Sequence, residues 1–510
     1  MKTMRLSITY FLCLISLPIL AQNESDVLRL SQYYTGGTAR GMSMGGAFGA
    51  LGADMTSLSI NPAGIGAYRT SEFTLTPSLN IDNTKSKFYG NNYSDSKYNL
   101  NLNNIGYVYT FNTNKDQGWV STSLGVTYNR LSDFNRNITI VGKNTNSSML
   151  DEFIMNANSV PGTTLNEKVN NLDYNYELLA WDTYALFYDK KSTSATYNLF
   201  LHDFKDFGYN QDVERTITTK GGIGEYAFSF GANYSHQLYL GATIGIQSVS
   251  YDELKSHSEY NNSSDYLTSF TFNDQFNVRG TGYNFKAGLI YRPIELIRIG
   301  LAFHTPTFYN LDSEFSTSMS TQFKNSPPDN TQNQTSFYSS TDVTTYSYKI
   351  TTPMKTIASV ALQSQYGILS LDYEFVDYTK AKVRADDYAY TTANNNIQNS
   401  FRATGNLKIG AELKAGDYAI RGGYGYYGSP YKSDQFNKDA STQSYSFGMG
   451  YRGKSFFLDF GYIVFNSTYY HKLYDYEYYS TTDNKTYVVP ELSKIKSSSG
   501  RIIATLGFKF

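Results

Sequence analysis

The chain has 510 residues, a formal net charge of −1, 48 Tyr, 32 Phe, 40 Gly and a single Cys. Its charges form no basic block or stripe, which argues against a nucleic-acid partner. Cys13 is the only cysteine and precedes the expected mature chain, so disulfides, thiolate metal sites and cysteine nucleophiles are excluded there.

The first 21 residues have the pattern of a signal peptide. Lys2 and Arg5 precede an apolar run over residues 6–20, and Ala21 supplies a small residue at the expected cleavage point. A run of this length is shorter than the ~20 apolar residues of a membrane-spanning helix. No apolar run of that length follows. A secreted chain rich in aromatic residues and glycine therefore favours the outer membrane of a Gram-negative cell and a β-barrel fold.

Residues 22–70 differ in composition from the rest of the chain. The stretch 36–68 is crowded with Gly, Ala, Ser and Met, and it has neither a helical nor a strand period. Dense glycine lets a chain bend tightly and pack against other backbone. We expect this segment to form a plug, or hatch, inside the lumen of a barrel that comprises residues 71–510.

After residue 70, apolar residues alternate with polar residues or glycine. Tyr226, Phe228 and Phe230, for example, alternate with small or polar neighbours. About fourteen such segments, joined alternately by short turns and long loops, predict an all-β, antiparallel transmembrane barrel. Two of these strands are expected to run unbroken over 296–318 and 342–364. The alternation also predicts lumen-facing charges at Lys286, Arg292, Arg298, Asp372, Glu374, Arg402, Lys408, Glu412, Lys414 and Arg421.

Two local features refine this prediction. The alternation changes phase in the second strand, which predicts a β-bulge near Asn103 and Asn104. The last strand, 501–510, ends on Phe510. Outer-membrane barrels commonly end on an aromatic residue, so we expect the barrel-assembly machinery to bind this end and outer-membrane lipid to surround the wall.

The longest connection, 132–223, is expected to be a large extracellular loop with a function of its own. Apolar residues recur within it at helical spacing, which predicts short helices. Their apolar faces either pack on one another or form a groove for a hydrophobic ligand. Candidate ligand-binding residues in the loop and the plug are Phe153, Ile154, Leu172, Leu179, Trp181, Met42, Met44, Phe48 and Leu51.

Three motifs make the chain resemble a known family. They are GTARGMSMGGAFGALGAD (37–54), SINPAGIG (59–66) and HTPTFY (304–309). Together with the C-terminal strand, they resemble the FadL/TodX family of outer-membrane transport proteins, in particular its Bacteroidetes branch. The resemblance implies a fourteen-stranded barrel with a hatch, and passage of long-chain fatty acids or other hydrophobic molecules. It also implies a hatch gate at the residues of the NPA motif and the glycine after it, Asn61, Pro62, Ala63 and Gly64.

Enzymatic chemistry has little support. The GxSxG pattern at 41–45 lies in the plug, whereas a nucleophile elbow needs a strand before it and a helix after it. The five histidines are scattered without a metal-ligand spacing. We therefore expect no catalytic set, metal or cofactor; a barrel hydrolase would depend on Ser43.

Two functions remain open. The first is passive transport of hydrophobic or amphiphilic small molecules, gated by a shift of the hatch around 61–66. The alternative is a FadL-like barrel that acts as a docking partner of a secretion or surface assembly. Polar loops at 325–341, 394–399 and 480–485 would suit a protein partner at the surface.

Overall fold

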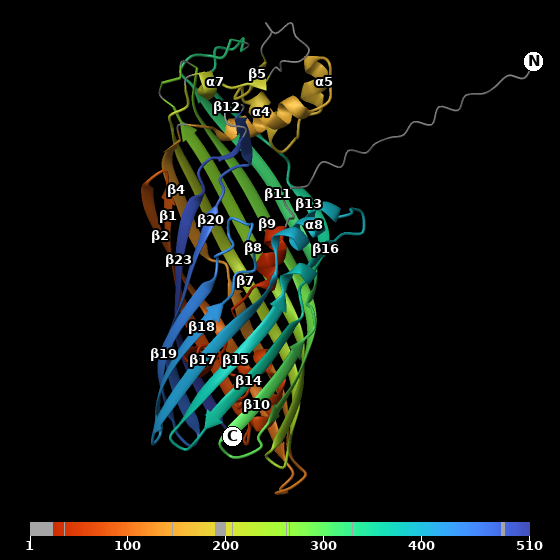
Figure 1. Ribbon diagram of the computed structural model, residues 1–510, viewed down its shortest axis with the longest axis vertical. Coiled ribbons are helices and arrows are strands. Elements are labelled where there is room, and N and C mark those ends of the chain that lie inside the picture. Colours follow the sequence, from red (N-terminus) through yellow and green to blue (C-terminus); the bar gives the residue numbers. More distant parts are fainter. Residues whose placement is uncertain are drawn as a thin grey trace, which may run out of the picture.

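The computed structural model describes residues 24–34, 36–144, 146–188, 200–206, 208–261, 263–264, 266–328, 330–480 and 485–510 (Figure 1). The expected signal peptide, 1–21, and most of the expected polar loop at 480–485 lie outside these residues. Among the described helices, none is both long and apolar enough to cross a membrane.

The wall is a closed antiparallel barrel of fourteen strands, as predicted. It closes because the last strand pairs with the first. Two of the fourteen are each built from two shorter strands, β10 with β11 and β13 with β14. The wall strands are β1 (Glu72–Phe88), β2 (Asn91–Asn112), β3 (Trp119–Asp133), β7 (Gln211–Tyr234), β8 (Leu238–Tyr260), β9 (Leu267–Tyr291), β10 (Ile297–His304), β11 (Phe308–Phe323), β13 (Thr344–Thr351), β14 (Lys355–Gln363), β15 (Gly367–Asp377), β17 (Ala403–Ala415), β18 (Tyr418–Tyr427), β19 (Thr442–Arg452), β20 (Phe456–His471) and β23 (Ser493–Lys509).

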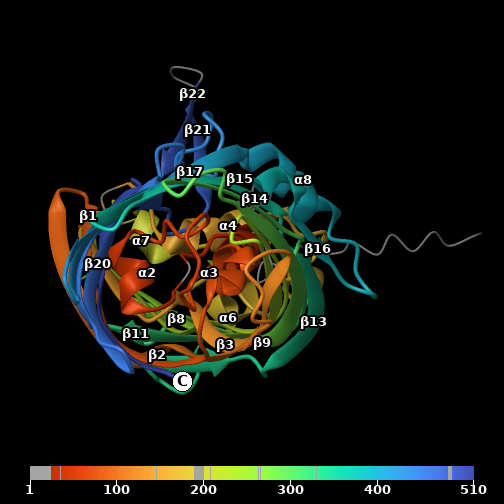
Figure 2. The same ribbon diagram turned by 90° about the horizontal axis from the view of Figure 1, so that it is seen from below.

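The plug (residues 24–71) lies within the ring of strands, where Figure 2 shows α2 and α3. Its elements are α1 (Glu24–Ser31), α2 (Ala39–Ser43), α3 (Ser57–Ile60) and the 3-10 helix η1 (Pro62–Ala67). The lumen is therefore occupied by the N-terminal segment, as its composition predicts.

The remaining elements lie in the half of the molecule away from the short turns (Figure 1). Short turns of outer-membrane barrels face the periplasm, so the opposite end faces the cell exterior. The strands here are β4 (Arg136–Asn144), β5 (Phe187–Tyr188), β6 (Phe200–Leu201), β12 (Ser336–Ser340), β16 (Lys382–Arg384), β21 (Tyr476–Ser480) and β22 (Lys485–Val489). The helices are α4 (Met149–Ser159), α5 (Leu165–Asn170), α6 (Glu177–Asp182), α7 (Asp203–Asp206), η2 (Tyr378–Lys380) and α8 (Thr391–Ser400). Of these elements, α4, α5 and α7 lie at the end of the molecule, and α8 and β16 lie nearer mid-height (Figure 1).

In the lipid band the wall strands have an apolar outer face and polar residues on the inner face, whereas inward residues further along several strands form an apolar cluster with α1. Tyr226, Phe228 and Phe230 are about half exposed on the outside, whereas Lys286 and Glu412 are buried inside. Such an exterior is suited to lipid. Two of the predicted lumen charges lie elsewhere, because Arg292 is in a turn and the exposed Arg402 precedes β17.

The bulge is confirmed at Asn103. Thr76 pairs with Asn104 and Pro77 with Leu102, so Asn103 has no partner on β1. The extra residue explains the change of phase in the sequence.

Two features differ from the prediction. The loop expected at 132–223 contains β4 and the first half of β7, so its strands extend beyond the lipid band. The strands expected over 296–318 and 342–364 are each broken at a proline. The registers on either side place Pro306 opposite Pro353. Proline has no N–H for the ladder, and two facing prolines interrupt both strands.

Candidate functional site

Inward-facing glycines of the wall hold the plug. A Cβ atom on Gly288 would lie 1.9 Å from Asn61 Oδ1, and one on Gly241 would lie 2.2 Å from the Pro62 carbonyl oxygen. A side chain at these positions would therefore overlap the plug. Close approaches of the same kind occur at Gly231, Gly300, Gly410, Gly423, Gly448 and Gly461.

The NPA motif forms the beginning of η1. Asn61 Nδ2 donates to the carbonyl oxygens of Gly49 (2.6 Å) and Leu289 (3.1 Å), and Asn61 Oδ1 accepts from Ala63 N (3.1 Å). Asn61 therefore caps η1 and ties it to β9, with Pro62 at the first helical position. Gly64 has no room for a Cβ, which would lie 2.5 Å from Ser57 Oγ. The four residues lie together; their role as a gate stays a prediction.

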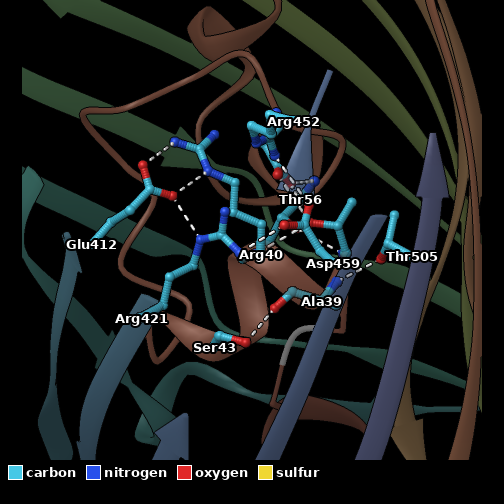
Figure 3. Close-up of polar contacts among 12 residues, drawn as sticks. Ala39, Arg40, Ser43, Thr56, Glu412, Arg421, Arg452, Asp459 and Thr505 are labelled. Atoms are coloured by element: carbon cyan, nitrogen blue, oxygen red, sulfur yellow. Dashed lines mark hydrogen bonds and ion pairs between the residues drawn. The ribbon is translucent and has the colours of Figure 1, made fainter. Parts of the chain in front are cut away.

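Buried charged groups join the plug to the wall on two sides, through an ion pair on one side and through a hydrogen bond to a wall ion pair on the other. Arg40 of α2 donates from Nε to Glu412 Oε2 (3.0 Å), which also accepts from Arg421 (2.6 Å) (Figure 3). On the other side, Glu225 Oε1 accepts from Ser59 of the plug (2.8 Å) and from Lys286 (2.5 Å). Ser43, the candidate nucleophile, donates to the Ala39 carbonyl oxygen at 2.6 Å and packs against the wall.

We expect Gly288→Val to prevent the plug from seating. The added methyl groups would overlap Asn61, and overpacking of this kind costs about 1–3 kcal/mol or more. The measurement is the apparent thermal midpoint of the detergent-purified barrel, followed by heat-dependent gel mobility. Gly422→Val is the control, because the nearest atom to its Cβ would be 3.9 Å away. Equal thermal midpoints for the two variants would contradict the inference that wall glycines make room for the plug.

The candidate ligand residues occupy three apolar clusters. Met44, Phe48 and Leu51 are buried between the plug and the wall, and Met42 is buried in a neighbouring cluster. In the extracellular cap (the described residues of 146–206), three are buried in one core and two pack partly exposed against it: Phe153, Leu172, Leu179, Ile154 and Trp181. None of the nine lines the large cavity described next. Their arrangement is the mutual burial considered above, and a ligand-binding role stays a prediction.

A cavity of about 790 Å³ lies between the plug and the cap, and we call it the vestibule. Its floor includes Tyr34 and residues of α1, and its roof includes Met149 and Glu152 of α4. Inward side chains of β7, β8, β9, β20 and β23 form its walls. The sequence interpretation missed it. Alternating polar and aromatic residues such as those of 249–255 were the only available signal.

The vestibule is charged and aromatic. Asp26 pairs with Arg29, and Lys255 pairs with Glu253 (2.7 Å). Burial raises the pKa of Asp26 to about 6 and that of Glu152 to about 7. Both carboxyls therefore carry less negative charge than ordinary acids near neutral pH.

Two vestibule arginines differ from these paired groups. Arg501 is 5% exposed and Arg215 is 7% exposed. Arg501 lies over the Phe465 ring (5.2 Å), and Arg215 donates to the Leu473 carbonyl oxygen. Within the described part of the chain, neither forms an ion pair with a carboxylate, and each has a buried Nε without a partner. A buried cation that has no carboxylate in ion-pair contact attracts an anionic group.

The wall has a break beside the vestibule. β2 pairs with β1 up to Asn91, but it pairs with β3 only from Asn104 to Asn112. No described strand forms a backbone ladder with the other edge of residues 91–103, and β4 pairs with β7 instead. Among the residues that the structure describes, only hydrogen bonds that involve side chains cross this stretch, for example from Lys97 Nζ to the Thr219 carbonyl oxygen (2.8 Å). We call the gap between residues 98–103 of β2 and 130–133 of β3 the side slit.

The side slit lies at the level of lipid. On β1 the outward residues change from Ile81 to Asn83 and Lys85, and Ile81 pairs with Tyr98. Tyr98 and Leu100 are therefore in the apolar band, where they are 67% and 77% exposed. Unpaired backbone facing lipid is costly and is tolerated where it lines a polar cavity.

The plug and the vestibule both reach this slit. Gly36 N donates to the Arg130 carbonyl oxygen (3.0 Å), and Asn103 Nδ2 donates to the Gly37 carbonyl oxygen (2.5 Å). Residues 36–37 thus cover the lower end of the slit. The vestibule is lined by Ser132, Asp133, Phe134 and Arg136, so it extends to the upper end.

Comparison with known proteins supports this fold. No family model and no curated protein matches the sequence. Among solved structures, a Pseudomonas aeruginosa FadL homologue is similar, with a TM-score of 0.54 and 11% identity, covering 94% of this chain and 100% of that chain. The P. putida toluene transporter TodX is also similar (TM-score 0.50, 11% identity, 94% and 99% coverage). The chain thus has the fold of FadL-type outer-membrane barrels, as its motifs predict.

Proposed function

We propose that this barrel is a passive outer-membrane channel for amphiphilic small molecules with an anionic head, such as long-chain fatty acids. The observation that carries the proposal is a vestibule with aromatic walls and unpaired buried arginines that reaches a slit facing lipid. Aromatic rings and apolar side chains suit the body of the ligand, and Arg501 suits its head. The similar barrel of P. putida is a toluene transporter, which is consistent with hydrophobic cargo.

In this proposal the cargo enters the vestibule from outside and leaves sideways through the slit into the bilayer. The plug blocks the direct path to the periplasm, because its backbone touches wall glycines around the lumen. Residues 36–37 cover the lower end of the slit, so a shift of the plug next to α2 would widen the exit. A shift around Asn61–Gly64, the gate that the family resemblance implies, is the other plug movement that would open the route.

The first test is native mass spectrometry with lipid extraction on the barrel purified from its own outer membrane in mild detergent. A bound fatty acid or similar amphiphile is the expected result. Arg501→Met should then weaken binding of a long-chain fatty acid about tenfold or more, because a hydrogen bond to a charged group contributes about 1.5–3 kcal/mol.

Arg279→Met is the matched control, since Arg279 is exposed on β9 and pairs with Asp252 away from the vestibule. Unchanged affinity in Arg501→Met would reject the head-group assignment. An empty barrel that arrives with a stoichiometric protein would favour the docking role instead.

A further inference from the structure

Three asparagine side chains meet on one carboxylate oxygen at the side slit. Asp133 Oδ2 accepts from Asn80 Nδ2 (2.9 Å), Asn99 Nδ2 (3.1 Å) and Asn101 Nδ2 (2.8 Å). Asn80 belongs to β1, Asn99 and Asn101 to β2, and Asp133 to the end of β3. These bonds cross the slit where the β2–β3 ladder is missing, so side chains replace the backbone ladder there.

The same carboxylate is bonded on its own side of the slit. Arg130 Nη2 lies 3.3 Å from Asp133 Oδ2, and Asp133 Oδ1 accepts from the backbone N and the side-chain Nδ2 of Asn135 (both 2.9 Å). Asp133 also lines the vestibule. One acidic residue therefore joins both sides of the slit and faces the space proposed for the cargo.

The sequence of β2 accounts for this arrangement. In residues 98–103, Tyr-Asn-Leu-Asn-Leu-Asn, the apolar residues face lipid and the asparagines face inward. The leucine side chains contact lipid on the outside. Each inward asparagine amide supplies a hydrogen-bond donor that reaches across the gap. A closure made of side chains can open by rotamer changes, whereas opening a backbone ladder would leave N–H and C=O groups unpaired in lipid.

We propose that Asp133, Asn80, Asn99 and Asn101 form a clasp that holds the side slit shut and gates the exit of cargo. This proposal rests on the proposed function. The donors that bind Asp133 are also suitable donors for a carboxylate head. An arriving head can replace Asp133 as their acceptor, so the clasp opens by exchange of one acceptor for another.

The test measures the width of the slit and transport separately. The expected mature chain has no cysteine, so spin labels can be attached at Ser96→Cys on β2 and Lys220→Cys on β7, both exposed and on opposite sides of the slit. Pulsed dipolar spectroscopy should give one narrow distance with Asp133 present. Asp133→Asn, which keeps the shape and removes the charged acceptor, should add a longer distance.

Basal uptake of a fluorescent long-chain fatty acid into proteoliposomes should rise about tenfold or more in the same variant, because the loss of even one of the charge-assisted hydrogen bonds to Asp133 corresponds to about tenfold. The paired variant Asn99→Ala/Asn101→Ala removes the two donors that belong to β2 and should have the same two effects. Asp252→Asn is the matched control, because this aspartate pairs with Arg279 on the outer wall. Heat-dependent gel mobility checks that every variant folds.

Two results would overturn the clasp. An unchanged distance in both the Asp133 and the asparagine variants would show that the slit is held shut by other contacts, and the proposed side exit would survive. A wider slit with unchanged uptake would remove the gating role, and the side exit with it.

Discussion

Lys286→Met is expected to destabilise the barrel by about 3–5 kcal/mol, because it leaves a buried carboxylate without its cation. Lys286 Nζ lies 2.5 Å from Glu225 Oε1, and the two residues are 1% and 0% exposed. Glu225 also accepts from Ser59 of the plug and from Gln247. Loss of the cation therefore disturbs a network that includes both plug and wall.

A double variant separates loss of the pair from loss of packing. Lys286→Met/Glu225→Gln removes both charges, and it should recover most of the lost stability. Lys349→Met is the surface control, since its partner Asp386 is largely exposed and such pairs contribute about 0–1 kcal/mol. Denaturant unfolding in micelles is the measurement. A single variant as stable as the surface control would contradict this account of the pair.

The second large effect is expected from a disulfide that fixes the plug to the wall. A Cβ atom on Gly461 would lie 2.4 Å from Ser43 Oγ. This approach suits a Ser43→Cys/Gly461→Cys disulfide, whose Cβ atoms need a separation of about 3.8 Å. The expected mature chain has no competing thiol. Oxidation should reduce fatty-acid uptake to the level of empty liposomes, because α2 next to residues 36–37 can no longer shift.

Reduction of the same protein should raise uptake above the oxidised level, so each sample is compared with itself. Ser43→Cys alone, treated with the same oxidant, shows whether the reagent acts elsewhere. Full transport by the oxidised double variant would mean that cargo passes without movement of the plug. The side slit would then have to open through the wall alone.

Most of the fold could be predicted from the sequence. Period-two alternation depends only on near neighbours along one strand. The barrel, its lipid face and the bulge at Asn103 could therefore be predicted from the sequence. The small-residue composition of 36–68 likewise predicted the plug. The breaks at Pro306 and Pro353 differ from the prediction although each proline is itself a sequence signal against an unbroken strand; only their facing arrangement requires the register of the two strands.

The candidate site was much less predictable. The apolar residues proposed from helical spacing, such as Phe153 and Leu172, pack on one another in the cap. The vestibule and its unpaired Arg501 arise from side chains that come from many different strands.

By itself, therefore, the sequence determined three features: the alternation of apolar and polar residues in the wall, the plug in the lumen, and the alternation of short turns with long loops. Each of these is encoded in local composition and period. Only the tertiary structure decided where the ladder between β2 and β3 ends and which side chains meet across the gap. Asn80, Asn99 and Asp133 are far apart in sequence, and their convergence depends on strand register, strand length and barrel closure. Those quantities are set by packing between distant segments, and local pattern does not encode them.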